Sequence, residues 1–328
     1  MRILVLGAGA VGGYFGGRLA QKRCDVTFLV RPKRAEALAR DGLRISSRFG
    51  DWRGQVNWVT QDQLKPEYDV VVLTAKAYDL AAAIDAIAPA LGEGKNGRGF
   101  VLPLLNGMAH MEMLDARFGR GRVLGGVAYI AAMLVPDGEI RHLNDFHRMV
   151  FGRRDDAQRA ACAALAAELA GVNFEWKLLD AIEQAMWDKW VLLATLAGIT
   201  CLMRASVGDI VATASGGALT LALLGECASV AAAEGFPTAE GTTANYRGML
   251  TQRGSAFTAS MLRDIESGGQ TEGDHILGAL LARARKRDLP CPLLEVATTH
   301  LEAYAARRRR EAEATVLPAK QDPSAGVR

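Results

Sequence analysis

The chain has 328 residues, more than one hydrophobic core usually holds, so its length predicts two domains. Half of the residues are hydrophobic and the formal net charge is only +3, which is the profile of a globular protein. This balance argues against general nucleic-acid binding, which needs a concentrated basic face, but it permits a locally cationic pocket for an acidic substrate.

The five cysteines form no CxxC pair, which is typical of free thiols in a reducing cytoplasm and not of a disulfide framework or a zinc site. Glycines interrupt the first apolar run at once, so we expect no signal peptide. The longest apolar stretch, residues 190–203, is too short to span a bilayer comfortably and predicts a buried core helix. We therefore expect a cytoplasmic protein with no membrane partner. The cysteines are Cys24, Cys162, Cys201, Cys227 and Cys291.

Apolar strand segments alternate with helical segments through the first half of the chain. Continuous apolar strands between helices predict a parallel sheet that is covered on both faces. Three later strand-like segments surround the turn Pro136-Asp137-Gly138, and we expect them to extend the same sheet. The predicted strands are residues 3–6, 26–30, 70–73 and 100–105, then segments in 123–135, 139–143 and 149–152, and the predicted helices are 12–22, 33–40 and 80–90.

The second half has little strand signal after residues 174–179. The helices expected there are residues 181–197, 218–234, 258–266, 275–286 and 293–307. The predicted fold class is α/β, with an N-terminal Rossmann-type doubly wound parallel sheet and an all-α C-terminal domain. We expect the Rossmann domain to span residues 1–175, the helical domain to span 176–308, and a disordered basic and polar tail to span 309–328.

A glycine-rich loop follows the first strand and opens the first helix. In the pattern Gly7-x-Gly9-x-x-Gly12, Gly7 permits the tight turn and Gly9 lets the backbone approach a pyrophosphate. Gly12 lets the helix pack closely on the strand, and the helix N-terminus favours the negative charge. The loop therefore predicts a dinucleotide site made by Gly7, Ala8, Gly9, Ala10, Val11 and Gly12.

The residue after the second strand indicates which dinucleotide is bound. NAD enzymes usually have an acidic residue here, whereas this chain has Arg31, which suits a 2′-phosphate. Lys33 and Arg34 add positive charge nearby. The pattern favours NADP over NAD, with a solvated surface cation as the alternative interpretation of Arg31.

Three further polar residues lie where ligands bind in such folds, or where a charge is unusual. Lys76 and Asn106 follow predicted strands, at the edge where open α/β sheets bind ligands, although either residue also suits an ordinary turn. Lys189 lies between large apolar residues in a predicted helix. A desolvated lysine can act as a general acid, and a lysine that extends past its apolar neighbours to water remains the alternative.

Taken in order, these segments resemble the ketopantoate reductase (2-dehydropantoate 2-reductase) family over about residues 1–305. The resemblance implies reduction of a 2-oxo acid or ketone by NADPH. The segments that carry it are residues 1–12, Arg31, Thr74-Ala75-Lys76-Ala77, Asn106-Gly107-Met108, Trp187-Asp188-Lys189, residues 260–264 and Thr271-Glu272.

The resemblance also implies a role for each matching residue. Lys189 would be the catalytic proton donor, and Ser260 would hold the substrate carboxylate. Lys76, Asn106 and Glu272 would contact the nicotinamide-ribose end of the cofactor or the substrate, with Asn106 and Lys189 both at the substrate. The backbone of Ala131 would contact the cofactor.

The chain departs from the family on one face of the lysine-bearing helix. Asparagines are expected one and two turns after the lysine and again a little later, where this chain has Leu193, Ala197 and Val207. A site built to bind a hydroxylated acid does not usually tolerate such losses, which puts the substrate in doubt. Compensation is conceivable from Thr195, Thr200 or Arg204, and a surface cation is the alternative interpretation of Arg204.

Two other functions remain open at this level. One is a protein that binds NADP as a sensor without catalysis, although a sensor has no need of a buried proton donor. The other is a different two-domain hydroxy-acid dehydrogenase, although none of the five histidines lies in an evident catalytic dyad. We expect a small acidic or ketone substrate, no metal and no nucleic-acid partner, and the family-like layout suggests a homodimer built on the helical domain.

Overall fold

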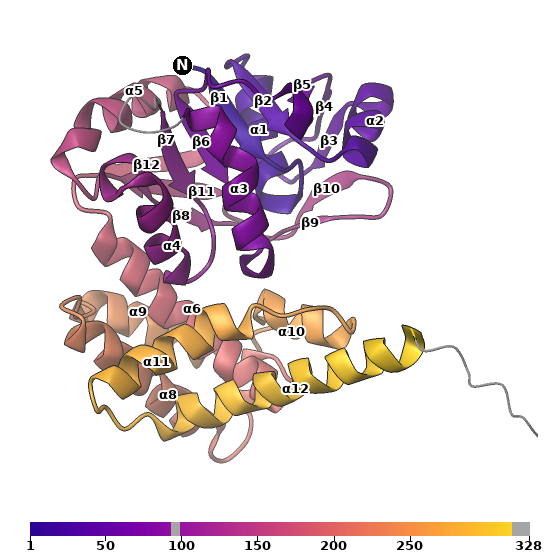
Figure 1. Cartoon of the computed structure of the whole chain (residues 1–328). Helices are drawn as coiled ribbons and strands as arrows, with labels where there is room; N and C mark the ends of the chain where they lie inside the picture. Colours follow the sequence, from indigo (N-terminus) through magenta and orange to yellow (C-terminus); the bar gives the residue numbers. More distant parts are fainter. Residues whose placement is uncertain (93–98, 317–328) are drawn as a thin grey trace, which may run out of the picture. The chain divides into compact units, whose positions relative to one another are not determined.

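The computed structural model describes residues 1–92 and 99–316 (Figure 1). The chain forms two compact units, the first made of Met1–Leu193 with Ala231–Thr243, and the second made of Ala194–Val230 with the chain from Ala244 onward. The first unit therefore continues beyond the boundary expected near residue 175. The reason is local packing, because Trp187 stacks on Phe236 with 5.7 Å between ring centroids, which ties both segments to the first unit.

A five-stranded parallel sheet forms the centre of the first unit, in the order β5-β2-β1-β6-β7 (Figure 1). The order reverses between β1 and β6, which is the Rossmann arrangement, and it confirms the predicted doubly wound sheet. Its strands are β1 (Ile3–Leu6), β2 (Val26–Leu29), β5 (Asn57–Val59), β6 (Val70–Leu73) and β7 (Phe100–Pro103), and the helices of this unit include α1 (Ala10–Gln21), α2 (Pro32–Asp41), α3 (Leu80–Leu91), α4 (Ala109–Phe118) and α5 (Arg159–Leu169).

The apolar strand sequences explain why this sheet lies at the centre. Every residue of β6 is buried, as are Ile3 and Val5 of β1, because helices cover the sheet and leave no face for polar side chains. The carboxyl ends of β1, β6 and β7 meet at one edge of the sheet, so the loops that follow them lie at the same edge.

The later strands do not extend the central sheet, and that prediction is wrong. They form a second sheet in the order β4-β3-β10-β9 and a third in the order β12-β11-β8. The side chains of β10 alternate between buried and exposed, which suits a sheet with one face in water. These strands are β3 (Leu43–Ser46), β4 (Trp52–Gly54), β8 (Gly125–Tyr129), β9 (Ala132–Leu134), β10 (Glu139–His142), β11 (Arg148–Gly152) and β12 (Glu175–Leu179).

The C-terminal part is helical, as predicted. Each expected helix is present, and the one expected over residues 275–286 begins with a π-helical segment, Asp274–Gly278. Its helices are α6 (Glu183–Met203), α7 (Val207–Val211), α8 (Gly216–Ala233), α9 (Glu240–Leu250), α10 (Ser260–Glu266), α11 (Ala279–Lys286) and α12 (Pro292–Val316).

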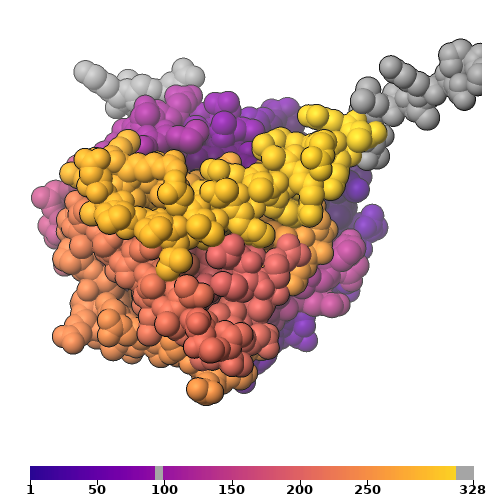
Figure 2. All heavy atoms as spheres, turned by 90° about the horizontal axis from the view of Figure 1, so that it is seen from below, coloured from indigo at the N-terminus to yellow at the C-terminus, as the bar shows by residue number. Residues whose placement is uncertain are grey.

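The prediction of a disordered tail from residue 309 is wrong for residues 309–316, which are helical. Helix α12, drawn in yellow along the surface of the second unit in Figure 2, continues to Val316. Arg308 Nε donates to Gly268 O at 2.9 Å, and Arg307 pairs with Glu311 one turn later at 3.6 Å, which supports the extra turns. Residues 317–328 lie outside the described residues, so the rest of that prediction stays untested.

Helices α6 and α8 are both long and apolar enough to cross a membrane by length and composition. In α6, 78% of the apolar window is buried inside the protein, as expected of the core helix that the sequence predicts over residues 190–203. In α8 only 39% of the window is buried, so much of an apolar helix lies at the surface.

Candidate functional site

The glycine loop has the geometry of a dinucleotide site. Gly7 has φ +84°, a conformation that side chains disfavour, directly after β1. A Cβ on Gly12 would lie 2.4 Å from Thr74 Oγ1 and 2.7 Å from Gly7 O, so close packing requires glycine there. A Cβ on Gly9 would meet nothing within 4 Å, so the space above this residue is open to a ligand.

The start of α1 adds an attraction for negative charge. No side chain caps its first amides, and its first turn carries no acidic residue. Uncapped amides at the N-terminus of a helix of this length point at any anion placed there, and the helix dipole favours that anion. The loop therefore fits the pyrophosphate of a dinucleotide.

Arg31 and Arg34 differ in what they contact. Arg31 precedes the first residue of α2 and is exposed, so it is accessible to a phosphate near the glycine loop. Arg34 turns inward, and its Nη2 donates to Ala8 O at 3.0 Å and to Gly138 O at 3.3 Å. Burial, followed by the nearby Arg44, lowers the pKa of Arg34. Arg34 thus braces the glycine loop against the β9–β10 turn, a role that the sequence did not predict.

Two of the predicted site residues come together in the first unit. Lys189 Nζ, on α6, donates to Asn106 Oδ1 at 3.2 Å and to Ala128 O at 2.5 Å. Lys189 is 9% exposed, so these contacts are shielded from water. The lysine points inward, so the alternative of a lysine that extends past its apolar neighbours to water does not apply. Lys76 is half-buried in the loop that follows β6, at the same edge of the sheet as Asn106.

An aromatic residue that sequence reasoning missed lies beside this lysine. The Tyr129 ring centroid is 5.5 Å from Lys189 Nζ, and Arg148 Cζ is also 5.5 Å from the same centroid. Burial raises the pKa of Tyr129. Its contact with Lys189 joins distant parts of the chain, and no local motif could have revealed it.

Ala131 follows β8, and both of its backbone polar groups have partners within the protein. Its N–H donates to Asn144 Oδ1 at 2.9 Å, and its carbonyl accepts from Leu143 N at 2.7 Å. A contact to the cofactor would therefore add to bonds that already fix this segment. The predicted role of Ala131 stays a prediction.

A buried group of ring and hydroxyl side chains continues from Asn144. Its Oδ1 is 2.8 Å from His142 Nε2, and His142 Nδ1 is 3.0 Å from Ser47 Oγ. Tyr14 Oη is in turn 2.6 Å from His147 Nδ1. Burial first, then His142 and Arg18, lowers the pKa of His147 to about 4.

The remaining predicted residues belong to the second unit, apart from Leu193. Ser260 is exposed as the first residue of α10, whereas Glu272 is 7% exposed. Their roles beside Lys189 stay predictions. Arg204 is exposed at the end of α6, as its alternative interpretation expected.

The residues at the positions where asparagines were expected are apolar and largely buried. Ala197 and Val207 are buried, and Leu193 is half-buried on α6 one turn after Lys189. Thr200 does not compensate as a free hydroxyl, because its Oγ1 already donates to Leu196 O at 2.7 Å.

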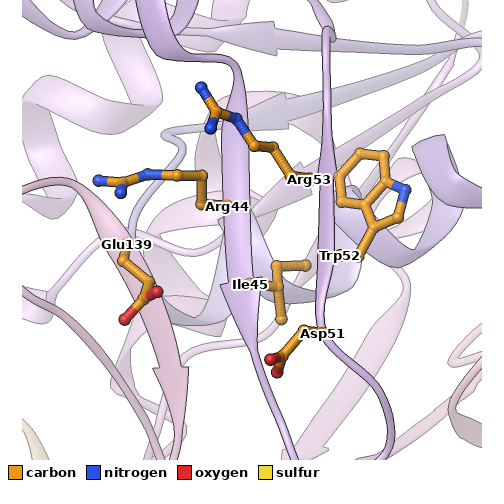
Figure 3. Close-up of a pocket in the computed structure, with 6 residues that line it drawn as sticks. All are labelled: Arg44, Ile45, Asp51, Trp52, Arg53 and Glu139. Carbon is orange, nitrogen blue, oxygen red and sulfur yellow. The ribbon is translucent and has the colours of Figure 1, made fainter.

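A separate pocket of about 290 Å³ lies on the second sheet of the first unit (Figure 3). Among the described residues, no group of three or more His, Cys, Asp or Glu side chains could hold a metal ion. None of the predicted site residues lines the pocket, whose lining is Arg44, Ile45, Asp51, Trp52, Arg53 and Glu139.

Comparison of the chain with known proteins identifies the family whose models it matches. Residues 3–156 match the family model for ketopantoate reductase PanE/ApbA, and residues 181–305 match its C-terminal model. An uncharacterized oxidoreductase, YkpB of Bacillus subtilis, is 38% identical over 308 residues, which cover 94% of this chain and 100% of that protein.

Two solved structures have the same fold. A PanE/ApbA family ketopantoate reductase from Ralstonia eutropha has a TM-score of 0.83 at 24% identity, covering 94% of this chain and 100% of that one. D-mandelate dehydrogenase, solved with NADH and anilino(oxo)acetate, has a TM-score of 0.83 at 21% identity, covering 94% and 99%.

Proposed function

Because the chain belongs to the ketopantoate reductase family, we propose that it catalyses the NADPH-dependent reduction of a 2-oxo acid or a related ketone. The observation that carries the proposal is the Lys189 ammonium, shielded from water and held by Asn106 and the Ala128 carbonyl. Both of these acceptors are neutral oxygens that fix the position of the ammonium, and an ammonium held in this way is a suitable general acid.

The cofactor, when bound, supplies a hydride to the carbonyl carbon. Lys189 gives a proton to the oxygen on which alkoxide charge develops, and Asn106 holds the lysine in place. Gly9 and the uncapped start of α1 would hold the pyrophosphate, and Arg31 would hold a 2′-phosphate. D-mandelate dehydrogenase was solved with NADH, so the choice of NADP for this chain depends on Arg31.

We further propose that the substrate is more apolar than ketopantoate. Leu193 lies one turn after Lys189, where a hydrogen-bonding side chain was expected. D-mandelate dehydrogenase was solved with an oxo acid that carries an aromatic substituent. Each missing hydrogen bond costs about 0.5–1.5 kcal/mol, and an unpaired buried hydroxyl costs about 1–3 kcal/mol. Two or three such losses weaken ketopantoate by roughly two to four orders of magnitude.

The test is a spectrophotometric screen of NADPH oxidation with ketopantoate, 2-oxoisovalerate and phenylglyoxylate as substrates. We expect a higher kcat/KM for an apolar acid than for ketopantoate, by at least about tenfold. If ketopantoate is preferred by a large factor, the interpretation of Leu193 is wrong and the family activity applies unchanged.

A substitution of Lys189 tests its proposed role as the proton donor. Lys189→Ala should lower kcat by roughly a hundredfold or more, the usual effect of losing a general acid, and leave NADPH affinity nearly unchanged. Lys177→Ala removes an exposed lysine of the same unit and should change neither value. Near-normal turnover by Lys189→Ala contradicts the mechanism, whereas NADPH binding with no turnover of any substrate supports the sensor alternative.

We also propose a cytoplasmic homodimer. The five cysteines are free, which suits a reducing compartment. The apolar surface of α8 includes Leu221, 38% exposed, and this surface suits a second copy of the chain.

A further inference from the structure

Two consecutive residues at the end of β8 contact the Lys189 ammonium in different ways. Ala128, the fourth residue of β8, accepts a hydrogen bond from Lys189 Nζ through its carbonyl. Tyr129, the next residue, has its ring centroid 5.5 Å from the same nitrogen. A cation within about 6 Å of an aromatic centroid is attracted by the ring, and more strongly where water is excluded.

The neighbouring strand holds this ring in place. Arg148 of β11 is the register partner of Tyr129, and its guanidinium also lies 5.5 Å from the ring centroid. Arg148 in turn pairs with Glu175 of β12 at 3.4 Å. The ring is therefore positioned by the third sheet, independently of the helix that carries Lys189.

The other charged groups that act on the ring leave it neutral. Burial raises the pKa of the Tyr129 phenol, Arg148 opposes that rise, and Asp188 of α6 adds to it. Asp188 points elsewhere, because its carboxylate accepts from Gln184 Nε2 at 2.9 Å on its own helix. The phenol thus acts on the ammonium as a neutral aromatic face and not as a counter-charge.

We propose that Tyr129 is a positioning residue, whose ring holds the side chain of Lys189 at the end of β8 and stabilises its charged form. This inference rests on the proposed function only in taking Lys189 as the proton donor. Its consequence is that the ring extends, toward higher pH, the range in which Lys189 carries the proton that it must give.

The test compares Tyr129→Leu, which removes the aromatic face, with Tyr129→Phe, which keeps the face and removes only the hydroxyl. The full chain is labelled with acetic anhydride across a pH series, and the acetylated fraction of each lysine is read by peptide mass spectrometry. We expect the half-labelling pH of Lys189 to fall by about 0.5–1 unit in the leucine variant, and to stay near the unmodified value in the phenylalanine variant. Exposed Lys177 serves as the internal reference.

This readout needs no substrate, so it separates failure of the inference from failure of the proposed function. Where turnover is found, the alkaline fall of kcat should move to lower pH in the leucine variant alone, with KM little changed. An unchanged Lys189 titration in a folded leucine variant overturns the inference. So does a phenylalanine variant that shifts as far as leucine, because the hydroxyl would then be the active group. If the leucine variant does not fold, Tyr129→Met removes the aromatic face with an unbranched side chain that adapts to the same space, and the same two outcomes apply.

Discussion

The preference for one nicotinamide cofactor over the other depends on a single exposed guanidinium. Arg31 stands at the start of α2, two residues after Leu29, whose carbonyl accepts from Gly7 N at 2.9 Å. A charge-assisted contact to a 2′-phosphate is worth about 1.5–3 kcal/mol, so NADPH should bind at least about tenfold more tightly than NADH. Arg31→Ala should remove most of this preference in fluorescence titrations. Arg40→Ala, which removes an exposed cation at the other end of α2, should retain it. Equal affinities in the unmodified protein would count against an NADP site.

The buried imidazole of His147 should make the free energy of unfolding depend on pH. Burial lowers the pKa of His147 from 6.5 to about 4, so between these values the unfolded chain binds a proton that the folded chain does not. The free energy of unfolding should therefore fall as the pH drops from about 6.5 to 4, by up to about 3 kcal/mol, and the group contributes nothing to the slope above that range.

Urea unfolding at a series of pH values checks this expectation. His147→Asn removes the titrating ring and keeps an acceptor for the Tyr14 hydroxyl, which lies 2.6 Å from His147 Nδ1. The variant should show a flatter dependence on pH over the same range. Parallel curves for the two proteins would mean that another group is responsible.

At the level of elements, we expect two glycines of the loop to have different roles, Gly12 in packing and Gly9 in cofactor binding. A methyl group on Gly12 would lie 2.4 Å from Thr74 Oγ1, so Gly12→Ala should lower the free energy of unfolding by about 1–3 kcal/mol. A methyl group on Gly9 meets no protein atom within 4 Å. Gly9→Ala should therefore keep normal stability and lose NADPH affinity, because the methyl group enters the space left for the pyrophosphate. Calorimetry and cofactor titration distinguish the two variants, and equal loss of stability in both contradicts the argument.

The sequence predicts local elements better than their partners. Apolar runs identify β1, β2, β6 and β7, because a buried parallel strand has a distinctive composition. The short strands β3, β4 and β5 were missed, and β8 to β11 were recognised but assigned to the wrong sheet. Their pairing, such as β10 beside β3, joins residues about a hundred positions apart and leaves no local signal.

The same distinction holds within the candidate site. Motif spacing pointed to Asn106 and Lys189, and the structure brings them together. Tyr129 and the Arg34 brace depend on tertiary contacts, so composition and spacing could not reveal them. The glycine loop was predictable because Gly7 is required by backbone geometry and Gly12 by close packing, whereas the groups that support the loop can come from any part of the fold.

For the whole molecule, the exposed side of α8 predicts the oligomeric state. An apolar helix that is only 39% buried leaves a surface that association would cover. Sedimentation velocity should show a species of twice the 35.1 kDa chain mass, and Leu221→Arg should shift it toward the monomer. Leu178→Arg, at a similarly exposed leucine of β12, should leave the mass unchanged. A monomer at all concentrations would refute the proposed dimer.

The helix that carries Lys189, the proposed proton donor, contributes residues to both units. α6 is continuous from Glu183 to Met203, and the division between the units falls after Leu193, one turn beyond Lys189. Gly198 is held closely within the second unit, where an added Cβ would lie 2.9 Å from Leu223. A change in packing around Gly198 therefore acts on the same continuous helix that carries Lys189.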